Sequence, residues 1–410
     1  MVTSKGSGGY RVEMLGHGAL NFKGNLEKVF NSPTKIAAVA FLLGGLYLAA
    51  RILVAGHGDA ASLIVAGSRY VESNKLGIPI PIIKGSGYDG QFYFRLALDP
   101  FSFARSHSGI TFDNPFRAQR IIFPLLAWLT ALGNPHLVPI SMLVVELLSW
   151  ISITYFAAQL ATTAGRSPAL GLVVAAFPGY FFSVGRDLTE PTATALLLAG
   201  TFYLQKARYW RAASFLSLSV LTKETGMVLV FSLFVLWAIA QFDRSGSTSR
   251  VRVPFYTWLI PLLFFGAWQL FLRLVERNEP LRSDISGNLS LPAIAMIRGI
   301  WDRILNPIPL GNTLWLIQFG TLTLLAIFTL AKLRSKSVPS LFRVTFVTML
   351  ALAISLSNEI WLNDNYLRSV DLIWVFGWLI LIFSGSPVQK SYWVLLVATA
   401  MTATQLVFFI

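Results

Sequence analysis

Cysteine is absent from the 410-residue sequence. Its absence excludes disulfide bonds, catalysis by a thiolate, and zinc or iron–sulfur sites that depend on cysteine ligands. Histidine is scarce as well, and the four that occur, His17, His57, His107 and His136, lack the spacing of metal ligands. The sequence therefore predicts no metal centre built from cysteine or histidine.

Charged residues are also few. They make up only 13% of the chain, whereas a water-soluble domain carries about 25%. Hydrophobic residues reach 55% and the mean hydropathy is +0.62, so most of the surface is expected to face something other than water. The 12 Trp and 12 Tyr residues suit the aromatic belts found where membrane proteins meet the two interfaces.

The motifs of several large enzyme classes are missing too. The sequence contains no P-loop, no GxSxG elbow, no HExxH pair and no EF-hand pattern. ATP hydrolysis and serine-hydrolase chemistry therefore find no support.

Long apolar runs dominate what is present, and most approach the ~20 residues that cross a bilayer as a helix. They predict an all-α polytopic membrane protein with about eleven transmembrane helices, preceded by a basic cytoplasmic tail over residues 1–35 and beginning with an uncleaved signal anchor. The runs lie at 36–55, 138–161, 168–185, 190–205, 211–222, 225–242, 254–272, 312–331, 344–357, 369–384 and 391–410.

The apolar stretch 121–133 is too short to be counted with these runs, and Pro124 lies near its start. We expect it to form an interfacial helix rather than a span. With the N-terminus inside and this stretch not spanning, the predicted inner segments carry the whole net charge of +14. This is the asymmetry of the positive-inside rule, so the basic excess is attributed to membrane topology and no nucleic-acid partner is expected.

This topology predicts four parts after the tail. Residues 36–272 would form a catalytic transmembrane core that includes a large first outer loop, 56–137, with interfacial helices. A second outer loop would cover 273–311, and a C-terminal transmembrane module would cover 312–410.

The first cluster of polar residues is GSGYDGQFYFRLALDP, Gly85 to Pro100. Glycines flank Asp89 and let the backbone turn tightly and approach a ligand closely. The neighbouring aromatic residues would hold the segment at the membrane interface, with the carboxylate near the lipid headgroups. An ordinary Asx-turn residue is an equally good interpretation of Asp89.

The second cluster is GRDLTEP, from Gly185 to Pro191. Asp187 and Glu190 are three residues apart and would share one face if the segment is helical. Capping of the next helix by Asp187 or Thr189 is the simpler explanation, although it leaves the pair of acids beside Arg186 unexplained.

The third cluster, LTKETG, places Lys223 and Glu224 between two apolar runs. A cation at that depth is costly without a partner, and a phosphate is a natural one; pairing of Lys223 with Glu224 is the alternative. Arg368, Arg117 and Arg120 complete a basic set near the same side, for which snorkelling to headgroups is the simpler account.

Glu146 is the one clear acid inside a predicted span. Ionisable groups within a membrane are functional by default, but a structural pairing with Arg186 or Lys223 explains Glu146 equally well.

At these residues the sequence resembles the GT-C superfamily of membrane glycosyltransferases, within which it is similar to PIG-V-like mannosyltransferases and to protein-mannosyl and aminoarabinose transferases. The resemblance is carried by YDGQFYFRLALDP, FPGYFFSVGRDLTEPTATALLLAGTFYL and RYWRAASFLSLSVLTKETG. Together these motifs cover roughly the first two-thirds of the chain. Each is loose, but their order and their predicted sides of the membrane match together.

The resemblance implies catalytic roles for three acids: Asp89 as the base, with Asp187 and Glu190 at the outer end of the third span. It implies that Lys223 lies near the phosphate of the donor. We add Arg368, Arg117 and Arg120 to the phosphate-binding set, and Tyr88, Gln91, Glu224 and Glu146 as supporting residues. Gln91 stands where some members have the second acid of a DxD or DxE motif, so no cofactor is certain and a divalent cation stays open.

The expected function is that of an integral membrane glycosyltransferase in a bacterial inner or plasma membrane. A polyprenyl-phosphate sugar would be the donor, and a lipid, glycan or protein the acceptor, on the extracytoplasmic side. A carboxylate would deprotonate the acceptor hydroxyl, and direct attack with one base would invert the anomeric centre. A transporter or lipid flippase is the main alternative and a membrane scaffold the next, although transporters often show inverted repeats and midplane charges, which this sequence does not.

Overall fold

The computed structural model describes residues 31–242, 253–276, 279–306, 310–363 and 366–385. The protein is 72% helical, and the regular strands within the described residues form two sheets of two strands each. The predicted helical class is therefore confirmed. Most of the expected tail, 1–35, and the whole expected span 391–410 lie outside the described residues.

Five helices within the described residues are long and apolar enough to cross a membrane, and they indicate an integral membrane protein. α10 reaches that length together with the 3₁₀ turn η5 (Glu224–Gly226) that precedes it. The five are α2 (Pro33–Val54), α5 (Val138–Thr163), α10 (Met227–Phe242), α11 (Tyr256–Glu276) and α14 (Leu310–Lys332).

The prediction of about eleven transmembrane helices is wrong for the part of the chain that the structure describes. The run 168–185 breaks before Pro178 into α6 (Leu170–Ala175) and α7 (Pro178–Val184). Four further runs form helices of 13 to 16 residues, shorter than the ~20 needed to span. These are α8 (Glu190–Gln205), α9 (Tyr209–Thr222), α15 (Ser340–Ile354) and α18 (Asp371–Phe383).

The short helices are apolar because they are buried among the long ones. α8 packs against α5 and α9, and α18 packs against α14 and α15. Every residue of α18 from Asp371 to Ile382 is buried, which is typical of a helix that is hydrophobic on all sides inside a large core. An apolar run in the sequence therefore does not distinguish a lipid-facing helix from a protein core.

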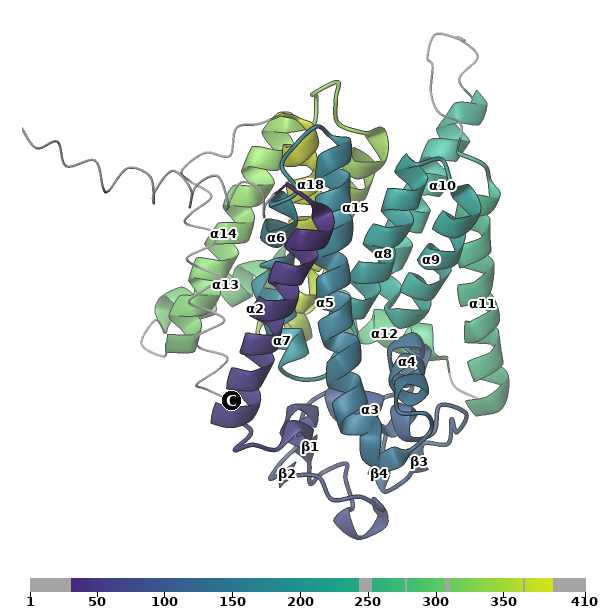
Figure 1. Cartoon of the computed structure of the whole chain (residues 1–410), viewed down its shortest axis with the longest axis vertical. Helices are drawn as coiled ribbons and strands as arrows, with labels where there is room; N and C mark the ends of the chain where they lie inside the picture. The colour runs from purple at the N-terminus through teal and green to yellow at the C-terminus, as the bar shows by residue number, and fades with distance from the viewer. Residues whose placement is uncertain (1–30, 243–252, 277–278, 307–309, 364–365, 386–410) are drawn as a thin grey trace, which may run out of the picture.

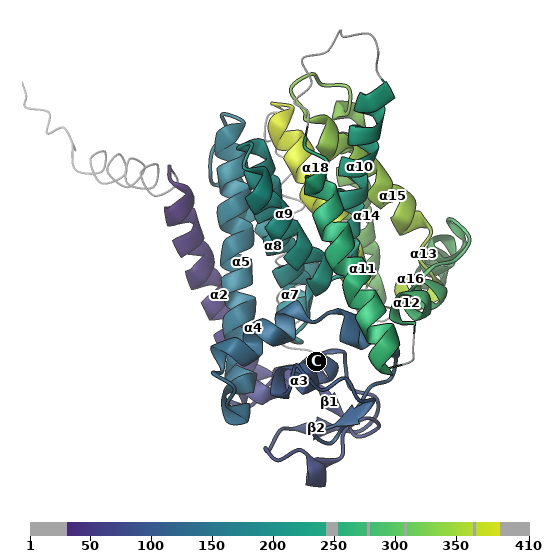
Figure 2. The same ribbon diagram turned by 90° about the vertical axis from the view of Figure 1, so that its right-hand side faces the viewer.

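Residues 55–137 gather at one end of the helix bundle, as Figures 1 and 2 show, and enclose a hydrophobic core of their own. Two strands here are parallel and two form a hairpin. The segment contains η1 (Ala60–Ile64), β1 (Ala66–Gly67), η2 (Ser73–Lys75), β2 (Ile82–Ile83), α3 (Gly90–Leu98), β3 (Ser106–His107), β4 (Ile110–Thr111), η3 (Pro115–Gln119), α4 (Ile122–Thr130) and η4 (Pro135–Leu137).

α4 is the short apolar helix that was expected between residues 121 and 133. It has nine residues, or about 14 Å of helix, and is therefore too short to cross a membrane. α4 packs against α3, α5 and α9, where it supports the segment that precedes it.

The expected second outer loop contains α12 (Pro280–Asn288) and α13 (Ile294–Leu305). α12 packs against η3 of the first loop segment and against α16 (Asn358–Trp361). A further short helix, α17 (Tyr366–Ser369), contacts α16 and α7. These contacts bring segments from the first, middle and last thirds of the chain to the same end of the bundle.

Candidate active site

Glycines hold Asp89 where the first loop segment meets the bundle. A Cβ atom on Gly90 would lie 2.3 Å from the carbonyl oxygen of Arg186, and one on Gly87, which has a φ of +64°, would lie 2.4 Å from the amide nitrogen of Gly67. Only glycine permits both approaches. Asp89 precedes α3, but its side chain makes no capping hydrogen bond, so the Asx-turn interpretation does not account for its carboxylate.

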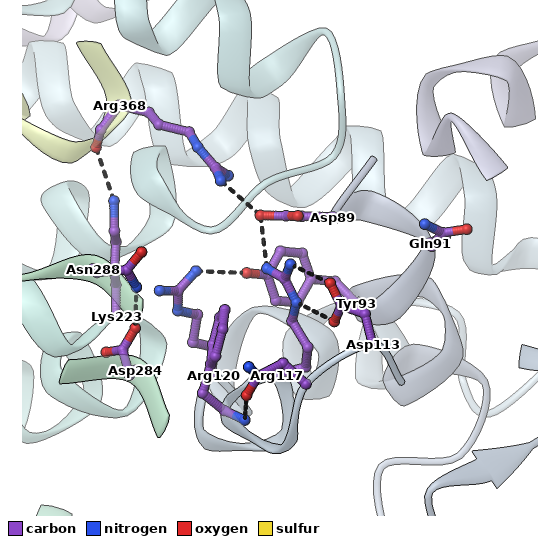
Figure 3. Close-up of polar contacts among 12 residues, drawn as sticks. Asp89, Gln91, Tyr93, Asp113, Arg117, Arg120, Lys223, Asp284, Asn288 and Arg368 are labelled. Atoms are coloured by element: carbon purple, nitrogen blue, oxygen red, sulfur yellow. Dashed lines mark hydrogen bonds and ion pairs between the residues drawn. The ribbon is translucent and has the colours of Figure 1, made fainter. Parts of the chain in front are cut away.

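Two arginines share the carboxylate of Asp89 (Figure 3). Arg117 Nη1 lies 2.8 Å, and Arg368 Nη2 2.7 Å, from Asp89 Oδ2. Arg117 also forms a two-pronged ion pair with Asp113, over 2.9 and 2.8 Å. Burial of Asp89 opposes its ionisation, but the charges of Arg117 and Arg368 outweigh burial and hold the pKa of Asp89 below its usual range. Asp89 is therefore a carboxylate at neutral pH.

Glu190 and Lys223 form a second, fully buried ion pair. Lys223 Nζ lies 3.0 Å from Glu190 Oε1 and donates a 2.8 Å hydrogen bond to the carbonyl oxygen of Arg368. Ser183 donates to the other oxygen of Glu190 over 3.1 Å, and the Arg368 guanidinium lies 3.6 Å from Glu190. The structure therefore does not show the alternative pairing of Lys223 with Glu224. Arg368 lies between Asp89 and Glu190.

Glu224 pairs instead with Arg120. The two side chains meet over 2.6 and 3.0 Å, and Arg120 Nη1 also donates to the buried hydroxyl of Tyr93 over 2.9 Å. Gln119 donates from its amide nitrogen to Glu224 over 3.1 Å and to Asp284 over 3.2 Å. Gln119 thus links the carboxyl groups of Glu224 and Asp284 at the junction of η3, η5 and α12.

These ion pairs line one cavity of about 580 Å³. One part of its wall is charged and the other is apolar, the apolar part coming from α10, α11, α12 and α15. The charged and polar lining comprises Asp89, Arg117, Arg120, Glu190, Lys223, Glu224, Thr225, Asp284, Asn288, Thr348, Glu359, Asn363, Arg368 and Ser369. The apolar lining includes Phe116, Met227, Val228, Phe231, Phe265, Leu281, Ile285, Leu289, Leu352, Leu356 and Ile360.

Asp187 and Glu146 do not line this cavity. Asp187 has a φ of +51°, so it is not helical and does not share a face with Glu190. Neither Asp187 nor Thr189 caps α8 with its side chain. The carboxyl groups of Asp187 and Glu146 are completely buried, and within the described residues they make no hydrogen bond of normal geometry. The backbone amide of Leu188 faces Glu146. Among the described contacts Lys223 pairs with Glu190, and no ion pair joins Glu146 to Arg186 or Lys223.

The two expected supporting residues of the first loop have different places. Gln91 is buried and accepts a hydrogen bond from the amide of Gly67 over 3.0 Å, while its amide nitrogen donates to Ser86 over 2.8 Å. Gln91 therefore ties the glycine loop, Gly85–Gly87, to Gly67 and does not face the cavity. The ring of Tyr88 lies 5.2 Å from the guanidinium of Arg368 and 5.4 Å from that of Arg186, so Tyr88 positions these cations.

Sequence reasoning missed Asp284, Asn288 and Tyr93. Asn288 donates to Asp284 over 2.6 Å and fixes it on the cavity wall. Burial, together with the nearby charge of Glu224, raises the pKa of Asp284 to about 6. Asp284 and Asn288 are one helical turn apart in a polar stretch, and this spacing was the signal in the sequence that could have identified them. Tyr93 could have been found in the same way, because it is one helical turn beyond Asp89.

Within the described ranges, no group of three or more His, Asp or Glu side chains could hold a metal ion. The positive charges that face the cavity belong to Arg and Lys side chains. No protein-family model matches the chain, and no curated protein sequence matches it significantly.

Proposed function

We propose that the protein is a membrane glycosyltransferase of the GT-C type, which transfers a sugar from a polyprenyl-phosphate donor to a hydroxyl group of a lipid, glycan or protein. One observation carries this proposal: five acidic side chains, four cations and an apolar wall share a single cavity at one end of a membrane-embedded helix bundle. A lipid phosphate has the matching parts, namely an anionic group and a hydrocarbon chain.

The cations suit the departing phosphate. Lys223, Arg368 and Arg120 line the same cavity as Asp89, and charge-assisted hydrogen bonds to phosphate oxygens are among the stronger polar contacts in proteins. Cations fixed at the place where negative charge develops stabilise the transition state of bond cleavage. We therefore assign donor-phosphate binding to Lys223, Arg368 and Arg120, with Arg117 beside them.

Asp89 is the proposed base, and its two arginines set its basicity. Arg117 and Arg368 make Asp89 a weak base, because they stabilise its anionic form. A donor phosphate that attracts Arg368 would weaken this pairing and raise the basicity of Asp89 when an acceptor is to be deprotonated. A single base with direct attack on the anomeric carbon gives inversion.

The apolar wall supports a lipid-linked donor over a soluble nucleotide sugar. Phe231 on α10 and Ile285 on α12 line the cavity and are 51% and 48% exposed at the surface of the bundle. The wall therefore continues from the charged group to the outside, which lets a long hydrocarbon chain leave sideways while its phosphate stays in the cavity.

The charge asymmetry of the sequence supports an extracytoplasmic position for this end of the bundle, in a bacterial inner or plasma membrane. A transporter or flippase remains the second candidate, favoured by the buried carboxyl groups of Glu146 and Asp187, since intramembrane acids often mark transport pathways.

The deciding experiment uses purified protein and a panel of polyprenyl-phosphate sugars with acceptor extracts. Release of polyprenyl phosphate that requires the acceptor would support sugar transfer. Movement of an intact lipid across vesicles without release would support the flippase instead.

A further inference from the structure

The amphipathic helix α13 carries its large apolar side chains on the outside of the protein. Ile297, Trp301 and Ile304 are 58%, 62% and 52% exposed, and Ile294 and Leu305 beside them are also exposed. The spacing of three and four residues puts them on one helical face. An amphipathic helix of a soluble protein would bury such a face against its core.

The opposite face of α13 is the one that packs against the protein, where Met296 and Ile300 contact the hydrophobic core beside small and polar residues. Ala295 and Gly299 are buried there, and a Cβ atom on Gly299 would lie 2.7 Å from the carbonyl oxygen of Trp361. The guanidinium of Arg303 lies 4.8 Å from the ring of Trp315. The helix is thus held closely, with its apolar face turned outward as a consequence of that packing.

The place of α13 in the fold indicates which partner covers this face. α13 ends at Leu305 and packs against α14, which is long and apolar enough to cross a membrane. α13 also packs against α16, and Figure 2 shows both helices at the flank of the bundle. Leu324 on α14 is also exposed, so α13 packs against a helix whose exposed apolar side chains are expected to face lipid.

Charged residues border only one side of the apolar face. Arg298 and Asp302 are exposed, and on a helical projection both lie next to the apolar stripe, away from its centre. Such an arrangement, with Trp and Ile on one face and a cation beside them, is typical of helices that lie in the plane of the membrane interface.

We propose that α13 is an interfacial helix whose apolar face inserts between the headgroups and acyl chains of the leaflet on the cavity side, with lipid as its partner. Leu289, which follows α12 and precedes α13 in the chain, is itself both exposed and part of the apolar wall of the cavity. This placement does not depend on the chemistry of the cavity.

The test uses the full-length chain in vesicles of phosphatidylcholine and phosphatidylglycerol. Because the protein has no cysteine, single nitroxide labels can be attached without background, and their collisions with oxygen and with a water-soluble nickel chelate can be compared. The labelled variants are Ile297→Cys, Arg298→Cys, Trp301→Cys, Asp302→Cys and Ile304→Cys. Leu324→Cys on α14 is the lipid control, and Lys75→Cys in the first loop segment is the water control.

We expect the oxygen-to-nickel accessibility ratio to vary along α13 with a period of ~3.6 residues. Labels at 297, 301 and 304 should approach the Leu324→Cys control, and labels at 298 and 302 should approach the Lys75→Cys control. Nickel access at all five positions would overturn the proposal. Labels at 297, 301 and 304 that neither reagent reaches would also overturn it, because protein, either a second copy or residues 386–410, would then cover the face.

Discussion

Arg368 donates a 2.7 Å hydrogen bond to Asp89, although 279 residues separate the two in the sequence. The motifs that suggested the proposed function lie in the first two-thirds of the chain, whereas Arg368 belongs to the last third. The C-terminal part therefore supplies a cation to the candidate site and controls the basicity of the proposed base.

Replacing Arg368 should change both donor affinity and pH dependence. Arg368→Gln removes a charge-assisted contact worth ~1.5–3 kcal/mol, so the KM for donor should rise by about 10- to 100-fold. Because the charge of Arg368 helps to keep the pKa of Asp89 low, its loss should shift the acidic limb of the rate profile to higher pH. Steady-state kinetics between pH 4 and 8 would measure both effects, with Arg273→Gln, on the exposed surface, as the matched control.

An unchanged acidic limb in Arg368→Gln would show that Asp89 does not titrate in the rate-limiting step. An unchanged KM would remove Arg368 from the phosphate set.

Variants of the buried pair of Lys223 and Glu190 can distinguish a role in stability from a role in donor binding. Lys223→Met leaves Glu190 with the hydrogen bond from Ser183 and, among the described cations, the more distant Arg368, and breaking one side of a buried ion pair costs ~3–5 kcal/mol. The double variant Lys223→Met with Glu190→Gln removes both charges and should regain much of the stability. Thermal unfolding in detergent would follow this recovery, while donor binding should stay weak in both variants. Donor affinity at the wild-type level in the double variant would show that Lys223 is purely structural.

The raised pKa of Asp284 predicts that its contribution to stability falls as the pH rises, whereas the lowered pKa of Asp89 has the opposite effect. Its folded pKa of about 6 lies above the unfolded value of 3.8, so the folded protein binds more protons than the unfolded chain between these pH values. Stability from this group is present below about pH 4 and is lost as the pH rises to 6, by up to ~3 kcal/mol. Asp284→Asn should remove this decline, measured as the difference in unfolding temperature between variant and wild type at pH 4.5 and 7. Parallel curves for the two proteins would contradict the assignment.

Topology can be tested on intact cells with a membrane-impermeant maleimide. Ser86→Cys, in the exposed glycine loop beside Asp89, should react, whereas Lys336→Cys, also exposed, should react only after permeabilisation. The absence of native cysteine keeps the background low. Labelling of both positions from the same side would overturn the predicted topology and the extracytoplasmic site with it.

Much of the candidate site could be found in the sequence because cations and acids at the ends of apolar runs are costly and therefore conspicuous. Asp89, Glu190, Lys223, Arg368 and the two loop arginines all face the cavity. Their pairing could not be found in this way, because it depends on how distant helices meet. Lys223 is adjacent to Glu224 in the chain but pairs with Glu190.

Other errors have equally specific causes. The spacing of Asp187 and Glu190 indicated a shared face only if the segment was helical, and the positive φ of Asp187 breaks that condition. The number of spans was overestimated because α18 is apolar through burial in protein rather than contact with lipid. Asp284 was missed because its spacing from Asn288 indicates only a polar helical face, and the sequence does not show that α12 packs against the first loop segment.

The most direct test of the account is the rate of polyprenyl-phosphate release by Asp89→Asn. The asparagine keeps the shape of the side chain and removes its basicity, so turnover should fall by ~10²–10⁴ while the variant still folds and binds donor. Asp187→Asn is the matched control, since that carboxyl group lies outside the cavity, and it should keep turnover close to wild type. Near wild-type release by Asp89→Asn, together with an inactive Asp187→Asn, would contradict the assignment of Asp89 as the base.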